Sequence, residues 1–365
     1  MKQRSISVTT RSIPSQTPRM VFLDYLRVFA FASVLIGHKF AQPLEAAISE
    51  PTSLWHWPAQ ILWPWVRAGG AGVLVFFLVS GYIITYVLER ENCVEFLIRR
   101  AARIYPLYMV AVLAEYGMQT SGQRVPVSTL LWQLSLLGNW NDTPYALGTA
   151  EWTLRLELMF YLLMAAFRGL GLMAWRGGAI LPLLYAALVL VLFAVGPWPN
   201  HAANGLGYVS LYFPFLLVGA IVQLQERGSV SRLTAVLFVA WVLCCHYLGL
   251  VRWQAAWLNA YFPLLALSLF LVLWWGRRLW SGPAWLLWLS ELTYAVYLLH
   301  NWAFDRLRDG ATQLGAGTVM APALALLALL VVCAALVRAV EQPGIRWGRR
   351  ISLSLRAGGR SPVTP

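Results

Sequence analysis

Charged residues are scarce in this chain. Only 12% of its 365 residues are Asp, Glu, Lys or Arg, and 59% are hydrophobic. A soluble domain usually carries about a quarter charged residues, so the composition argues against an ordinary soluble protein. The apolar stretches that recur along the whole length predict instead an all-α integral membrane protein whose main partner is the lipid bilayer.

Cysteine is also rare, with four copies in the chain. Cys244, Cys245 and Cys333 lie inside apolar segments, and together with Cys93 they show no metal-ligand spacing. The sequence therefore predicts neither a disulfide framework nor a metal site.

Ten segments are apolar enough to be predicted as membrane spans. A spanning helix needs roughly 20 mainly apolar residues, and we expect such helices at 21–41, 67–88, 101–118, 151–168, 178–196, 206–225, 233–251, 255–275, 285–304 and 318–339. The first shows no cleavage signature and is expected to be retained as a helix. The shorter stretch 129–138 is expected to lie in the membrane interface. The chain is thus predicted to consist of a short segment 1–20, a transmembrane bundle 21–340 and a basic, disordered tail 341–365.

The basic residues predict the orientation of this bundle. The net charge of +13 comes from residues that punctuate apolar runs, so we expect no nucleic-acid partner. With the N-terminus placed inside, 20 of the 28 Lys and Arg residues fall in inner segments and five in outer ones. Both termini are therefore predicted to be cytoplasmic. The tryptophans of the outer loops 42–66 and 119–150 are typical of an aromatic belt, although aromatic faces also stack on sugar rings.

The first span carries ionisable residues that a bilayer disfavours. Each costs about 2.5–3.5 kcal/mol at a helix centre, which makes them candidates for function. Arg27 and His38 are eleven residues apart, so they share one helix face and lie about 16 Å apart along the axis. Asp24 lies close to that face. Alternatively, Arg27 could reach the cytoplasmic interface paired with Asp24, and His38 could be a hydrogen-bonded core residue.

The fourth span contains a second candidate group. Because this span runs from outside to inside, Glu157 is expected about a turn and a half below the outer surface, at the depth of His38. Tyr161 follows four residues later and shares its face. A histidine and a carboxylate at one depth could form a base and its orienting partner. The alternative is a structural ion pair of Glu157 with Arg155 or Arg67.

Three arginines crowd the cytoplasmic start of the third span, namely Arg99, Arg100 and Arg103. Arginine forks bind phosphates well, and coenzyme A carries several. The alternative is that these residues only anchor the loop at the inner surface.

Five segments in order resemble acyltransferase family 3, the multi-pass membrane acyltransferases that decorate carbohydrates. The resemblance extends from about Phe22 to Glu341. The segments are Leu23-Asp24-Tyr25-Leu26-Arg27 through Gly37-His38, Gly72 to Gly81, Phe96 to Pro106, Trp152-Thr153-Leu154 with Glu157 and Phe160-Tyr161, and Leu289 to His300. The Asp-Tyr-Leu-Arg start and the Trp-Thr-Leu form are similar to the exopolysaccharide-production branch. Leu158 and Leu74 replace polar residues that many members have, which leaves the acceptor open.

This resemblance implies an O-acyltransferase of the bacterial inner membrane. It would move an acyl group, most often acetyl, from cytoplasmic acyl-CoA to a hydroxyl of an extracytoplasmic polysaccharide or glycan such as an exopolysaccharide. The expected catalytic residues are His38 as general base, Glu157 as its partner, and Arg27 at the oxyanion or the donor. The expected binding residues are Arg99, Arg100 and Arg103 for acyl-CoA and Trp152, Tyr161 and His300 for the substrate.

Several alternatives stay open at this point. A covalent acyl-histidine relay would use the same residues. A lipid or a protein could be the acceptor. A proton-coupled transporter or flippase of a glycan or lipid precursor would also need a histidine and a carboxylate within the membrane. The oligomeric state is not predicted.

Overall fold

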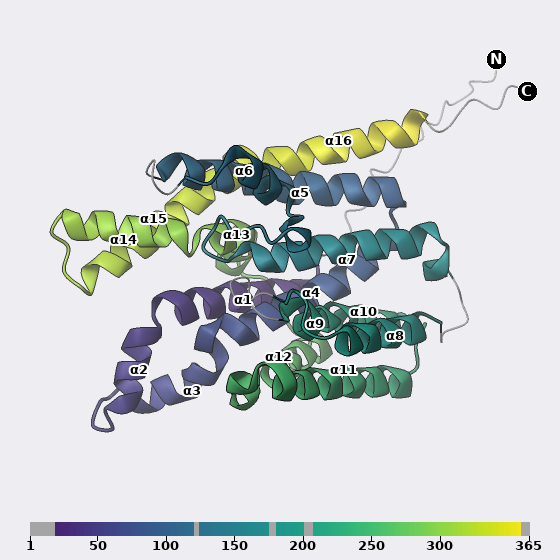
Figure 1. Ribbon diagram of the computed structural model, residues 1–365, viewed down its shortest axis with the longest axis horizontal. Coiled ribbons are helices and arrows are strands. Elements are labelled where there is room, and N and C mark those ends of the chain that lie inside the picture. Colours follow the sequence, from purple (N-terminus) through teal and green to yellow (C-terminus); the bar gives the residue numbers. More distant parts are fainter. Residues whose placement is uncertain (1–18, 120–123, 175–179, 201–206, 359–365) are drawn as a thin grey trace, which may run out of the picture.

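The chain folds as a bundle of helices (Figure 1). The computed structural model describes residues 19–119, 124–174, 180–200 and 207–358, and every regular element in these ranges is a helix. The all-α prediction is therefore confirmed. Most of the predicted segment 1–20 and the end of the predicted tail lie outside the described residues.

The first half of the chain contains α1 (Val21–Lys39), α2 (Ala41–Ser49), α3 (His56–Val66), the short η1 (Arg67–Gly69), α4 (Gly70–Leu88), α5 (Cys93–Met118), α6 (Val127–Ser135), η2 (Gly138–Trp140), α7 (Glu151–Gly169) and η3 (Leu172–Ala174). The second half contains α8 (Ile180–Val195), α9 (Tyr208–Tyr212), α10 (Pro214–Glu226), α11 (Arg232–Trp253), η5 (Ala255–Ala260), α12 (Phe262–Trp275), α13 (Ala284–Leu299), α14 (Trp302–Gln313), α15 (Met320–Leu336), η6 (Val337–Glu341) and α16 (Gln342–Gly358).

The helices have the lengths and composition of membrane spans. Within the described ranges, six helical segments are long and apolar enough to cross a bilayer, and they are Val21–Lys39, His56–Leu88, Tyr208–Glu226, Arg232–Trp253, Ala255–Trp275 and Met320–Arg356. Two shorter apolar helices, Ile180–Val195 and Ala284–Leu299, accompany them. Helices α5 and α7 coincide with predicted spans but carry several charged residues. A helical membrane protein is thus supported, while the count of ten spans and their orientation stay predictions.

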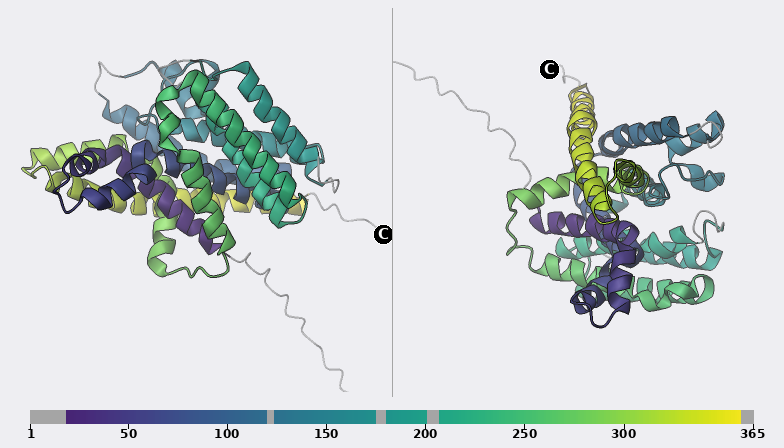
Figure 2. Two further views of the ribbon diagram at one scale, coloured as in Figure 1. Left: turned by 90° about the horizontal axis from the view of Figure 1, so that it is seen from below. Right: turned by 90° about the vertical axis from the view of Figure 1, so that its left-hand side faces the viewer.

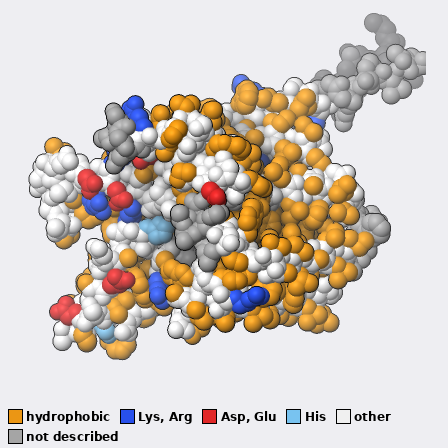
Figure 3. Space-filling model, viewed as in Figure 1, with side chains coloured by type: hydrophobic (Ala, Val, Ile, Leu, Met, Phe, Trp, Pro, Cys, Tyr) orange, Lys and Arg blue, Asp and Glu red, His pale blue; other side chains and the backbone are white. Residues whose placement is uncertain are grey.

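Apolar side chains cover much of the surface. Most long helices run along one direction, horizontal in Figure 1, and α2, α3 and α14 gather at the left-hand end. On the face shown in Figure 3, hydrophobic side chains dominate the centre and right, and most visible charged side chains lie towards the left. Exposed apolar residues on α8, α11, α12 and α15 include Leu190, Val236, Val272 and Val331. Such a continuous apolar surface is expected where lipid covers the protein.

Glycines bring helices α4 and α10 into close contact at the centre of the bundle. A Cβ on Gly81 would lie 1.8 Å from the Leu216 carbonyl oxygen, and one on Gly219 would lie 2.1 Å from that of Leu78. In lipid, association of apolar helices depends on van der Waals packing, which small residues at the crossing permit. This crossing fixes α4, whose Ser80 lines the site described below.

The C-terminal tail differs from the prediction of disorder beyond residue 341. Residues 342–358 form α16, which lies alongside α5 (Figures 1 and 2). Gly344 and Gly348 face Ala102 of α5, and a Cβ on Gly348 would lie 2.3 Å from the Ala102 Cβ. Arg356 forms an ion pair with the buried Glu95 of α5. The predicted disorder is therefore wrong over 342–358, because these glycines serve helix packing; 359–365 lie outside the described residues.

Candidate active site

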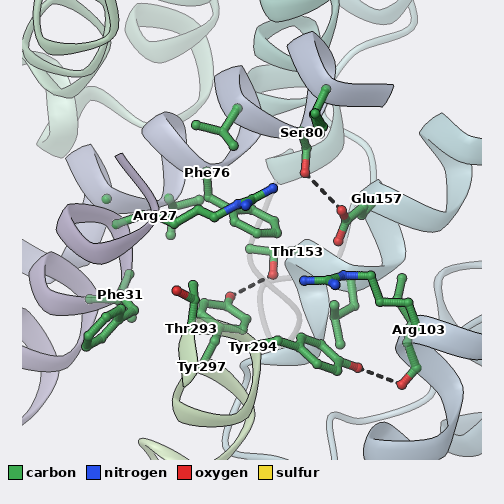
Figure 4. A pocket seen from close by; sticks show the side chains of 18 of the residues that line it. Arg27, Phe31, Phe76, Ser80, Arg103, Thr153, Glu157, Thr293, Tyr294 and Tyr297 are labelled. Carbon is green, nitrogen blue, oxygen red and sulfur yellow. Dashed lines mark hydrogen bonds between the residues drawn. The ribbon is translucent and has the colours of Figure 1, made fainter. Parts of the chain in front are cut away.

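A cavity lined by arginines lies between α1, α4, α5, α7 and α13, with a volume of about 130 Å³. Arg27, Arg100 and Arg103 form part of its wall, and Figure 4 shows the guanidinium groups of Arg27 and Arg103 pointing into it. We call it the arginine cavity. Small-molecule sites usually measure about 300–1,000 Å³, so this one suits the narrow end of a substrate.

The guanidinium groups of this cavity are weakly paired. Arg27 lies 3.8 Å from Asp24, whose oxygens already accept from Arg19 at 2.8 Å and Ser290 at 2.6 Å. The Nε of Arg100 is buried with no hydrogen-bond partner among the described residues. Unsatisfied guanidinium N–H groups in a cavity are suited to an anionic or carbonyl ligand. Pairing with Asp24 alone therefore does not account for Arg27.

The structure divides the predicted cluster of three arginines. Arg99 lies 2.7 Å from Glu91 and 2.7 Å from Glu95, and it donates to Ser352 of α16 at 3.0 Å. It does not line the arginine cavity in the described part of the chain. These contacts give Arg99 a structural role at the start of α5, whereas Arg100 and Arg103 face the cavity.

Glu157 belongs to the arginine cavity. Its carboxylate accepts a hydrogen bond from Ser80 at 2.9 Å (Figure 4) and another from Tyr161. All three side chains line the cavity. The predicted contact with His38 is absent among the described residues. The depth argument failed because Glu157 turns towards Ser80 of α4 and into the cavity, whose other charged side chains come from α1 and α5.

The alternative ion pairs of Glu157 are also absent from the part of the chain that the structure describes. Arg155 is buried and donates to Asn139 at 3.1 Å. Arg67 stacks over the ring of Trp257 at 5.6 Å. Both arginines therefore stabilise other contacts.

His38 instead pairs with His300. His38 Nδ1 lies 3.0 Å from His300 Nε2, and the two rings stack with centroids 5.1 Å apart. His38 is the next-to-last residue of α1 and is exposed, whereas His300 follows α13 and is only 1% exposed. The sequence predicted that His300 contacts the substrate. In the structure it pairs instead with His38, the predicted base.

The shorter hydrogen bond of this pair favours one tautomer of His38. A backbone carbonyl only accepts, so His300 Nδ1, which lies 2.6 Å from the Tyr297 oxygen, carries a proton. In a neutral His300, Nε2 is then the acceptor and His38 Nδ1 donates to it. A neutral His38 then has its lone pair on Nε2, and the longer contact of 3.3 Å to the Ala68 oxygen is left without a hydrogen bond. That carbonyl can accept a proton-bearing Nε2, so the arrangement suits a general base.

A second cavity, of about 300 Å³, lies beside the histidine pair. Its walls are mainly aromatic, and we call it the aromatic cavity; they include Tyr145, Trp152, Tyr208, Tyr212, Trp257 and Phe262. Ala68, whose oxygen faces His38, lines it, and Val73 lines both cavities. Of the predicted substrate residues, Trp152 therefore belongs to the aromatic cavity and Tyr161 to the arginine cavity.

The sequence had signals for two features that the predictions missed. His300 ends a predicted span at the outer side, as His38 does, so the two could have been paired by depth. Tyr208 and Tyr212 are four residues apart and share a helix face. The loop residue Trp140 differs from these two tyrosines because its side chain is 60% exposed.

Comparison with known proteins gives a consistent family. A family model described as "Acyltransferase domain" matches residues 20–338. The acyltransferase MdmB of Streptomyces mycarofaciens is 28% identical over 381 residues, covering 93% of this chain and 95% of that protein. The exopolysaccharide production protein ExoZ of Rhizobium meliloti is 25% identical over 350 residues, covering 80% and 95%. An O-acetyl transferase of Shigella phage Sf6 is 29% identical over 94 residues, covering 26% and 25%. No solved structure matches the chain.

Proposed function

Since this chain belongs to the acyltransferase family whose model matches residues 20–338 and is an O-acyltransferase, we propose the substrates of its reaction. The donor is acyl-CoA, with acetyl-CoA as the first candidate, taken from the cytoplasm. The acceptor is a hydroxyl of a polysaccharide or glycan outside the bacterial inner membrane. The observation that carries the proposal is a narrow, arginine-lined cavity that shares a wall with the cavity beside a histidine base.

The arginine cavity is the proposed donor site. Arg100 and Arg103 lie in the first turns of α5, at the predicted cytoplasmic end, where they would bind the phosphates of CoA. Arg27 is eleven residues before His38 on one helix, about 16 Å away along the axis. At that distance Arg27 is better placed to bind the pantetheine arm or phosphates than to stabilise an oxyanion beside His38.

His38 is the proposed general base. Its Nε2 takes the proton from the acceptor hydroxyl as that oxygen attacks the thioester carbonyl carbon. The new C–O bond replaces the C–S bond, and His38 returns the proton to the departing thiolate, which leaves as the thiol of CoA. The Ala68 carbonyl would accept a hydrogen bond from Nε2–H while His38 is protonated.

The acceptor side of the proposal is supported by the names of similar proteins. One relative is named for exopolysaccharide production and another is named an O-acetyl transferase.

A glycan transporter would require the histidine and carboxylate to form one proton-linked site, but Glu157 and His38 have different partners here. The acyltransferase reading therefore accounts for more of the geometry.

The test is label transfer by the protein in lipid nanodiscs. Radiolabelled acetyl-CoA is added with glycan, lipid and protein fractions of the source cells in separate reactions. Label that appears in the glycan fraction, and is released by mild base as expected of an ester, would support the proposal. Label confined to lipid or protein, with active enzyme, would overturn the acceptor assignment. Loss of transfer in His38→Ala, with normal membrane insertion, would support His38 as the base.

A further inference from the structure

The aromatic cavity combines broad ring faces with hydrogen-bonding groups. Trp152 lies edge-on to Tyr208 and beside Tyr212, with centroids 5.2 Å and 5.7 Å away. Trp257 also lines the cavity and packs against Phe262, with ring centroids 5.8 Å apart. Because these rings pack against one another, their faces are held in place before a ligand binds.

Polar groups line the same cavity without adding charge. Tyr145, Thr149 and Gln254 contribute hydroxyl and amide groups, and no Asp, Glu, Lys, Arg or His belongs to its described lining. A charged ligand would find no counter-charge in the walls. A ligand that carries hydroxyls would meet hydroxyl and amide groups, which can both donate and accept hydrogen bonds. Apolar faces with neutral hydrogen-bonding groups at their edges match a neutral sugar ring, which has C–H faces and a rim of hydroxyls.

The position of the cavity relates it to the reaction. Its lining comes from the starts of α4, α7 and α12, from α9 and from η5, which all lie at the same end of the bundle as His38. The Ala68 oxygen is 3.3 Å from His38 Nε2, and Ala68 itself is exposed on the cavity wall. A ring seated in this cavity would therefore bring a rim hydroxyl close to the base.

We propose that the aromatic cavity is the acceptor subsite, and that it binds one neutral pyranose ring of the glycan with its C–H faces against Trp152 and Trp257. The volume of about 300 Å³ is at the lower end for ligand sites. It suits one ring of a chain that continues outside. This inference rests on the proposed function, since it names where the acceptor of that reaction binds.

Ligand binding can be measured without turnover. Methyl β-D-glucopyranoside and methyl α-D-mannopyranoside are added to the protein in nanodiscs, and saturation-transfer NMR records which ligand protons lie against the protein. We expect transfer to the ring C–H protons of at least one pyranoside. Trp257→Ala should abolish this transfer, and Trp257→Phe should retain most of it because a ring face remains.

Turnover gives the second readout. With the labelled glycan fraction as acceptor, Trp257→Ala should raise the acceptor KM about tenfold and leave the donor KM unchanged. The matched control is Trp55→Ala, since Trp55 precedes α3 at the same end of the bundle and is 71% exposed. This variant should match the unmodified protein in both assays.

Contrary outcomes separate the two proposals. Equal pyranoside binding in Trp257→Ala and the unmodified protein would overturn the subsite, as would saturation transfer to hexanoate but to neither pyranoside. If pyranosides bind as expected but no label passes from acetyl-CoA to glycan, the proposed reaction fails, and the cavity stands as a sugar-binding site rather than as the acceptor subsite of that reaction. If label passes while Trp257→Ala leaves the acceptor KM unchanged, only the subsite fails.

Discussion

The arginine cavity and the aromatic cavity are neighbours with opposite chemistry. Arg27, Arg100 and Arg103 surround the first together with the carboxylate of Glu157, whereas the described lining of the second carries no charged side chain. Val73 is part of both walls. Under the proposed assignment, the bundle would recognise its two substrates by separate means, with charge in the arginine cavity and ring faces in the aromatic cavity. A group can then be transferred only where the two cavities meet.

The histidine pair lies at that boundary. Its hydrogen bonds reach Ala68, on the wall of the aromatic cavity, and Tyr297, on the wall of the arginine cavity. Substitutions in the pair should therefore reduce the chemical step itself. Substitutions in either cavity should change the use of one substrate and spare the other.

The largest effect is expected from His38→Ala. Removing a general base typically costs a factor of about 10² to 10⁴ in rate, and we expect a loss in this range with unchanged protein yield. Initial rates of label transfer at saturating donor and acceptor measure it. A variant that keeps a normal rate would remove His38 from the reaction and with it the link between the two cavities.

His300 should act through His38. His300→Phe removes the acceptor of the His38 Nδ1 proton and frees the ring to adopt the other tautomer, so we expect a loss of roughly tenfold to a hundredfold in kcat. His300→Gln offers a carbonyl oxygen and should recover part of that loss. In combination with His38→Ala, His300→Phe should add almost nothing, because residues that act as a unit are non-additive. A multiplicative loss in the double variant would show that His300 has a separate role.

The two cavities also show which features of the protein could be predicted from its sequence and which could not. The helical class and the family were predictable because hydropathy and motif spacing are local properties. The roles of Arg27 and His38 stay predictions. The partners of Glu157 and His38 were not, because depth along a helix does not say which way a side chain turns across the bundle. Helix α16 was not predicted because glycines such as Gly344 and Gly348 usually favour disorder. The structure shows that both glycines pack against Ala102 of α5.

The arginines should govern the donor alone. Arg27→Gln and Arg103→Gln each remove a charged donor to an anionic ligand, and we expect the donor KM to rise about tenfold with the acceptor KM unchanged. Arg99→Gln is the matched control, since Arg99 lies one turn from Arg103 and pairs with Glu91 and Glu95 outside the cavity lining. It should lower protein yield and leave the donor KM unchanged. A raised donor KM in Arg99→Gln would restore the three-arginine cluster as one site.

Glu157→Gln should have a moderate effect on the donor side. The amide oxygen can still accept from Ser80 and Tyr161, so packing should persist. The substitution removes the attraction between the Glu157 carboxylate and the arginine side chains of the cavity. Because those side chains are then held less firmly, we expect kcat/KM for the donor to fall about fivefold. Combined with His300→Gln, the two losses should multiply, as is usual for sites without shared partners. Non-additive losses would mean that Glu157 and His300 work together after all.

The smallest effect on catalysis is expected from the packing of α16 against α5, which bears on the arginine cavity only. Gly348 faces Ala102, where a Cβ would approach the Ala102 Cβ to 2.3 Å, so Gly348→Val must push the two helices apart. Overpacking of this kind typically costs about 1–3 kcal/mol of stability. Ala102 lies between Arg100 and Arg103 on α5, so a small displacement there should raise the donor KM about twofold to threefold, which is well below the effect of removing either guanidinium. The acceptor KM should stay unchanged because no part of α5 lines the aromatic cavity among the described residues.

The measurements are thermal unfolding in nanodiscs and both KM values, with Gly310→Ala as the control, since a Cβ there meets no neighbouring atom within 4 Å. A change in the acceptor KM of Gly348→Val would show that strain in α5 reaches the aromatic side, and the two cavities would then have to be treated as one coupled site.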